Sequence, residues 1–174
     1  MTTKTLLTVA DYAALDEPEG VRYELSEGEL IVTPSANYFH NRIRDRFNRL
    51  LALVEPRNLG SVISEMDFKL EGEVVRRPDV AFISAGQLQG IDLGQIPLPI
   101  APNLVIEIIS ENDRAADLLL KVSQYLAAGV RAVWLFYPST RLPIATSPAD
   151  SNPKSGALAR VTSLKSLSCS PDSL

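Results

Sequence analysis

The fold is decided by one stretch, Asn103-Leu104-Val105-Ile106-Glu107-Ile108-Ile109, in which a single glutamate interrupts a run of apolar residues. Such a run is typical of a strand that is buried on both faces of a sheet. A buried carboxylate costs free energy unless a cation or hydrogen-bond donors compensate its charge, and such groups often have a function. Glu107 is therefore a candidate for a functional site.

Two further charged residues stand beside apolar segments. Asp79 opens the apolar run 80–83, and Lys121 falls on a predicted helix fourteen residues after Glu107. An aspartate, a glutamate and a lysine from two strands and a helix suit a site for a hard divalent cation and a phosphodiester. Each also has a structural interpretation. Glu107 could pair with an arginine, Asp79 could only begin its strand, and Lys121 could form a surface pair with Asp117.

The sequence around the 103–109 strand predicts a single α/β domain. Alternating apolar residues predict strands, apolar residues at helical spacing predict helices, and Gly, Pro and Ser mark the turns. Ser110 or Asn112 is expected to cap the second long helix, with Gly129 as its stop signal. The predicted order is helix 8–18, hairpin 22–32, helix 37–54, hairpin strands 62–70 and 74–83, loop 84–102, strand 103–109, helix 112–128 and strand 131–137.

Symmetric pairing of the second hairpin about residue 72 would place Glu65 opposite Asp79, and Asp67 opposite Arg77. Two carboxylates side by side repel each other and therefore favour a bound cation. Magnesium prefers oxygen ligands, keeps several waters and commonly uses one or two carboxylates. A nearby lysine would then orient or deprotonate the attacking water, or offset negative charge in the transition state.

Other polar residues are weaker candidates. His40 lies at the edge of the apolar face of the 37–54 helix, where a hydrogen-bonded structural histidine is the ordinary interpretation, and Glu24 is expected to decorate the first hairpin. The accessory candidates are Glu24, His40, Glu65 and Tyr125. The candidate DNA contacts are Arg42, Arg46, Arg49 and Arg77. The three helix arginines share the face opposite the apolar stripe, where arginines are often simply solvated.

Composition limits the class of protein. A chain of 174 residues fits one domain with a sizeable core. The single histidine and the single cysteine, Cys169, argue against a zinc site and exclude an internal disulfide. The apolar runs are too short to span a bilayer and no signal peptide is recognisable, which favours a cytoplasmic protein. The net charge of -4 argues against nucleic-acid binding by bulk electrostatics, but not against a nuclease that contacts a few phosphates.

After Pro138 the composition changes to Ser, Pro and Thr without any aromatic residue. The sequence therefore predicts a domain over 1–138 and an irregular tail over 139–174, as an altered or frameshifted end would give. Within the tail, only 157–167 has some alternation and is expected to form at most a weak strand or helical turn.

A set of motifs keeps a fixed order and spacing from about residue 8 to Pro138. They are Tyr23-Glu24-Leu25, Gly28-Glu29-Leu30, His40, Arg77-Pro78-Asp79-Val80-Ala81-Phe82, the segment 102–110, Asp117, Lys121, Tyr125, Ala128-Gly129-Val130 and Val133-Trp134-Leu135. In these motifs the chain resembles the Uma-type family of restriction endonucleases, a bacterial group within the PD-(D/E)XK nuclease superfamily.

The resemblance implies a restriction-endonuclease-like core of helix, three strands, helix and strand. It also implies cleavage of DNA that depends on Mg²⁺ or Mn²⁺, with Asp79 and Glu107 as metal ligands; a homodimer is a further expectation. The superfamily lysine that follows the second acid by two residues is replaced here by Ile109. Lys121 stands where family variants supply a lysine from the following helix.

Two other classes of function remain open at this stage. A non-catalytic binding or assembly protein could use the same fold, since fold does not fix function. A glycosidase with paired carboxylates is a poorer alternative, because it gives Lys121 no role and the chain lacks the aromatic residues of a sugar cleft.

Overall fold

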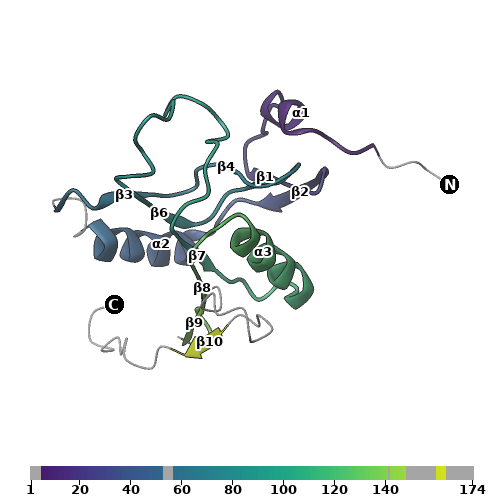
Figure 1. Ribbon diagram of the computed structural model, residues 1–174. Helices are drawn as coiled ribbons and strands as arrows, with labels where there is room; N and C mark the ends of the chain where they lie inside the picture. Colours follow the sequence, from purple (N-terminus) through teal and green to yellow (C-terminus); the bar gives the residue numbers. More distant parts are fainter. Residues whose placement is uncertain (1–4, 53–56, 141, 148–159, 164–174) are drawn as a thin grey trace, which may run out of the picture.

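The computed structural model describes residues 5–52, 57–140, 142–147 and 160–163 (Figure 1). The helices are α1 (Val9–Ala13), α2 (Tyr38–Leu51) and α3 (Ala115–Ala127). The strands are β1 (Val21–Ser26), β2 (Glu29–Pro34), β3 (Gly60–Ile63), β4 (Phe68–Lys69), β5 (Val75–Arg76), β6 (Val80–Ser84), β7 (Leu104–Ile108), β8 (Ala132–Tyr137), β9 (Leu142–Ser147) and β10 (Arg160–Ser163). They form a four-stranded sheet in the order β2-β1-β5-β4 and a six-stranded sheet in the order β10-β9-β8-β7-β6-β3.

The N-terminal hairpin forms as predicted and builds the smaller sheet. Its turn uses two residues of positive φ, Glu27 at 52° and Gly28 at 82°, which matches the twist of the flanking strands. On its other side β1 pairs with β5 through Leu25 and Val75. The short helix α1 packs Tyr12 against these two residues and closes a small core.

The second hairpin is bent and shared between the two sheets. Its register is symmetric about Gly72, as predicted, because Phe68 pairs with Arg76 and Val62 pairs with Phe82. However, the prediction of two continuous strands is wrong. Each is split, β3 from β4 and β6 from β5, because Pro78 has no N–H to donate and Glu65 adopts a φ of 54°. The break lies beside Asp79.

The central strands of the larger sheet form the predicted nuclease-like core. β6 pairs with β7 in antiparallel fashion, and β7 pairs with β8 in parallel through the crossover helix α3. The two long helices cover opposite faces of this sheet. Leu135 packs in the cluster that contains Tyr125 of α3, whereas the neighbouring Phe136 contacts Phe47 of α2 at 5.4 Å between ring centroids.

Helix boundaries differ from the prediction in detail. The first helix has only five residues, and α3 begins at Ala115 without a side-chain cap from Ser110 or Asn112. Phe39, an apolar residue within the predicted helix 37–54, is 74% exposed. The last two residues of the predicted helix 37–54 lie outside the described residues.

The segment that was expected to be an irregular tail contains two strands. β9 pairs with β8 from Leu142 to Thr146, and β10 pairs with β9 from Ser147 to Ile144. The prediction of an irregular segment from residue 139 is therefore wrong for 142–147, and the weak strand expected within 157–167 is present at 160–163. The pairing with β10 ends at Ile144, the residue next to Pro143. Pro143, which has no N–H group to donate, is therefore tolerated beyond the end of this ladder.

The long segment 84–102 covers part of the core with its two ends, whereas its middle, residues 92–96, is exposed. Leu98 is 2% exposed and bridges to Phe68, and Leu88 and Ile91 pack against the main core. Among the described residues, none of the helices has both the length and the hydrophobicity needed to cross a membrane.

Candidate functional site

Asp79 and Glu107 lie side by side where the two sheets meet. The β6–β7 register pairs Val80 with Ile106, so the next residues along, Asp79 and Glu107, stand opposite each other on one face. Both are buried, with exposed fractions of 5% and 6%. Asp79 also accepts a hydrogen bond of 2.7 Å from the backbone N–H of Ile108. The structure thus brings together the two carboxylates that the sequence singled out.

Lys121 reaches this pair from α3. Its Nζ atom lies 3.1 Å from Glu107 Oε1 and 2.9 Å from Glu24 Oε1. One turn further along, Tyr125 donates a hydrogen bond of 2.7 Å to the same Glu107 oxygen. Within the described part of the chain Lys121 forms no ion pair with Asp117, so the surface-pair interpretation is wrong. Ile109, two residues after Glu107, packs in the hydrophobic core.

Glu24 is buried at the centre of a polar network and does not merely decorate the hairpin. It accepts hydrogen bonds of 3.0 Å from Arg76 Nη1 and 2.8 Å from the backbone N–H of Arg77. Arg76 is 2% exposed and also donates to Ser26 and Gln124, so it ties β5 to β1 and α3. Arg76 was not a candidate on the sequence alone. The only signal was a second arginine before Pro78 in a strand that was predicted to be apolar.

His40 approaches Asp79 from the first turn of α2. Its Nε2 atom lies 2.6 Å from Asp79 Oδ1, and Arg22 Nη1 lies 3.9 Å from the same oxygen. Glu65 forms ion pairs with Arg22 and with Arg44, one turn beyond His40 on α2. Arg22 therefore links the carboxylates of Glu65 and Asp79, where the sequence had suggested a cation shared by the two.

The four candidate DNA contacts lie elsewhere. Arg42, Arg46 and Arg49 are exposed on the side of α2 that faces away from the His40 and Arg44 side chains. Arg77 donates to both oxygens of Asp67, at 2.6 and 3.0 Å, and to Glu17 at 2.7 Å. Its guanidinium holds these acids in place, which argues against a DNA contact for Arg77.

Burial and neighbouring charges raise the pKa of Glu107 and lower the pKa of Glu24. Burial, reinforced by the charges of Asp79 and Glu24, raises the pKa of Glu107 from 4.5 to about 7, although the Lys121 ammonium opposes the rise. Burial also acts to raise the pKa of Glu24, but Lys121 and Arg76 outweigh it and the net shift is downward. Burial lowers the pKa of Lys121, whereas Glu107 and Glu24 raise it more, so the ammonium stays protonated at neutral pH.

Replacing Glu107 with glutamine should change how stability depends on pH. A carboxyl pKa raised from 4.5 to about 7 means that the folded state holds a proton that the unfolded state has released. The free energy of unfolding should therefore fall as pH rises from about 4.5 to 7, by at most about 3 kcal/mol. Glu107→Gln removes this dependence, so its stability relative to wild type should rise over the same window.

Urea unfolding in EDTA at the two ends of this pH window measures the effect. Glu111→Gln, which changes an exposed carboxylate, is the matched control and should show no such trend. A stability difference between Glu107→Gln and wild type that is equal at both pH values would contradict the raised pKa.

The residues at the site fit a hard divalent cation held by two carboxylates. In the described ranges no group of three or more His, Cys, Asp or Glu side chains is arranged to hold a metal ion. Magnesium and manganese sites commonly use only one or two protein carboxylates and complete the shell with water and substrate oxygens. Asp79 and Glu107 are oxygen ligands on one face. Burial, reinforced by the charges of Asp79 and Glu24, raises the pKa of Glu107, and a bound cation would stabilise its ionised form.

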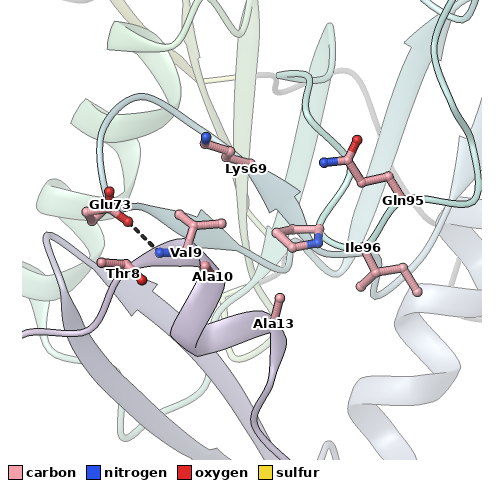
Figure 2. A pocket seen from close by; sticks show the side chains of 9 residues that line it. Thr8, Val9, Ala10, Ala13, Lys69, Glu73, Gln95 and Ile96 are labelled. Carbon is pink, nitrogen blue, oxygen red and sulfur yellow. Dashed lines mark hydrogen bonds between the residues drawn. The ribbon is translucent and has the colours of Figure 1, made fainter.

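A separate hollow of about 390 Å³ lies beside α1 (Figure 2). It is lined by Thr8, Val9, Ala10, Ala13, Lys69, Glu73, Gln95, Ile96 and Pro97. None of the candidate site residues lines it, so it is distinct from the carboxylate site.

Comparison with known proteins identifies one family that this chain matches. The sequence pattern of the Uma2 family, described as "Putative restriction endonuclease", matches residues 9–148. The chain belongs to the Uma2 family. Because the match extends ten residues beyond Pro138, the Uma2 pattern includes β9, in agreement with the structure.

A solved structure has the same fold as this Uma2 chain. It is described as "a putative nuclease belonging to DUF820 from Anabaena variabilis ATCC 29413". The two share 18% sequence identity with a TM-score of 0.72, over 88% of this chain and 83% of the other. No curated protein matches the chain.

Proposed function

We propose that this chain is an endonuclease that hydrolyses phosphodiester bonds in DNA and depends on Mg²⁺ or Mn²⁺. The observation that carries the proposal is the convergence of Asp79, Glu107 and Lys121, since Lys121 lies 3.1 Å from Glu107 and Asp79 stands opposite Glu107 in the sheet. Membership of the Uma2 family supports a nuclease.

The two carboxylates would hold the cation. When bound, the cation would neutralise charge on the scissile phosphate and make a nearby water molecule more acidic. His40 and the backbone N–H of Ile108 each bind one oxygen of Asp79, which fixes the orientation of this carboxylate. Tyr125 does the same for Glu107 through its hydroxyl group.

Lys121 would act through its charge. Because two carboxylates hold its pKa above the usual range, the ammonium is a poor general base at neutral pH. Of the roles that the sequence left open for this lysine, the structure favours orientation of the attacking water and stabilisation of negative charge in the transition state.

The test is a cleavage assay on supercoiled plasmid DNA with Mg²⁺ or Mn²⁺, in which EDTA should abolish the activity. Replacing Lys121 with methionine should lower the cleavage rate at least about 100-fold, because it removes the positive charge that would stabilise negative charge in the transition state. Lys121→Arg keeps the charge and should retain much more activity. Folding of both variants must be checked by thermal melting, since Lys121 bridges two buried carboxylates and its loss is expected to lower stability.

Equal rates for wild type and Lys121→Met would exclude the proposed role of this lysine. If the wild-type protein binds DNA but fails to cleave it with either metal, the chain is a non-catalytic binding protein on a nuclease fold.

A further inference from the structure

The first turn of α2 presents two aromatic rings to solvent. Tyr38 is 70% exposed and Phe39 is 74% exposed, and their ring centroids lie 5.6 Å apart at an interplanar angle of 78°. Single exposed apolar side chains are ordinary, but two large rings in mutual contact form an apolar patch. The candidate site does not use this patch, although the next residue, His40, contacts Asp79.

Three arginines extend the patch along the outer face of α2. Arg42, Arg46 and Arg49 follow Tyr38 at spacings of four, four and three residues, so they lie on the same side of the helix. With a rise of 1.5 Å per residue, the row from Tyr38 to Arg49 is about 17 Å long. All three arginines are exposed, and no acidic residue among those described forms an ion pair with them. This surface, Tyr38, Phe39, Arg42, Arg46 and Arg49, is called the α2 stripe below.

The composition of the α2 stripe fits a polyanion that also offers flat rings. The three arginines outnumber the single acid beside them, the exposed Asp45, so this helix face is locally positive on a chain whose net charge is -4. In a duplex the faces of the bases are stacked on one another, so exposed rings have nothing to bind there. In an unpaired strand each base has a free face, and stacking on an aromatic side chain adds to the phosphate contacts.

We propose that the α2 stripe binds an unpaired segment of nucleic acid, with the arginines on phosphates and the two rings against bases. The inference rests on the proposed nuclease function and deepens it. The α2 stripe lies on the face of α2 opposite His40, which contacts Asp79, so the stripe and the candidate site flank one helix. The substrate class is therefore DNA in which a single-stranded segment, such as a flap, a gap or a frayed end, extends from the bond that is cleaved.

Binding in EDTA tests this proposal without requiring cleavage. The fluorescence anisotropy of three labelled probes of about 16 nucleotides would be compared: a single strand, its duplex, and a strand with abasic sites in place of its bases. For Tyr38→Ala/Phe39→Ala the affinity for the single strand should fall about tenfold or more, with little change for the duplex and for the abasic strand. Leu119→Ala, at a 71% exposed apolar residue of α3, is the matched control and should leave all three affinities unchanged.

The arginines are tested by salt dependence. Replacing Arg42, Arg46 and Arg49 together with glutamine should reduce the slope of log affinity against log salt by up to about 2, since each phosphate contact on a single strand contributes about 0.7. The proposal is overturned if the ring variant binds the single strand as wild type does, or if it weakens the duplex and abasic probes equally.

A shift from dimer to monomer caused by the ring variant would also overturn it, because the rings would then be buried between two copies of the chain. A different outcome would contradict the proposed nuclease function. Wild-type protein that binds single strands through the α2 stripe but never cleaves DNA would contradict the enzyme and leave the binding surface intact.

Discussion

Replacing Asp79 with asparagine should abolish DNA cleavage and leave the fold intact. Asparagine has the same shape and can still accept the hydrogen bond from the backbone N–H of Ile108. It lacks the charge that, together with Glu107, would hold the cation. If the cation supplies several kcal/mol of transition-state stabilisation, the cleavage rate should fall by at least about a thousandfold.

A second measurement separates loss of metal binding from loss of structure. Mn²⁺ should raise the melting temperature of wild-type protein, because a ligand that binds only the folded state stabilises it, and should not raise that of Asp79→Asn. Asp117→Asn is the matched control, since Asp117 is an exposed aspartate in the first turn of α3. The metal site is refuted if Asp79→Asn cleaves DNA at the wild-type rate and keeps the full thermal shift.

The sequence predicted the elements whose signals are local. The strand around Glu107, the helix that carries Lys121 and the N-terminal hairpin all have apolar residues at a period that a single segment reveals. The register of the second hairpin was also predictable, because a turn centred on Gly72 fixes every pair beyond it.

The bend in that hairpin was not predictable from its own pattern. Residues 62–70 and 74–83 alternate as continuous strands do. The split arises because β4 and β5 join β1 in one sheet, whereas β3 and β6 join β7 in the other. Only the fold as a whole determines these partners, and Pro78 marks the place where the ladder can break.

For the site, the sequence identified the unusual residues and missed their partners. Asp79 and Glu107 stood out as carboxylates in apolar runs. The residues that compensate Glu24 and Glu65, such as Arg76 and Arg22, did not stand out, because each pairs with a residue more than forty positions away. An arginine in a short strand has no local signature that distinguishes a buried partner from a solvated side chain.

The error at β9 has a different cause. Leu142–Ser147 contains a proline, an alanine and two small polar residues, and β propensity alone does not favour a strand there. The strand forms because the edge of β8 offers unpaired backbone groups, and pairing with β9 satisfies them.

Replacing Arg76 with methionine should give the largest loss of stability of any change at the site. The substitution keeps an unbranched apolar stem but removes the donors to Glu24, Ser26 and Gln124. Glu24 would then remain buried with Lys121 as its main cation. Breaking a buried ion pair by removing one partner costs about 3–5 kcal/mol, which for a chain of this size corresponds to a fall in melting temperature of roughly 10 °C.

The double variant Arg76→Met/Glu24→Gln separates the loss of the ion pair from the loss of packing. If the cost comes from the uncompensated carboxylate, the second substitution should recover a large part of the lost stability, whereas the cost of a packing defect would simply add. Arg131→Met, at an exposed arginine, is the control and should change the free energy of unfolding by less than about 0.5 kcal/mol. Wild-type stability of Arg76→Met would contradict this prediction and would mean that Lys121 alone compensates the charge of Glu24.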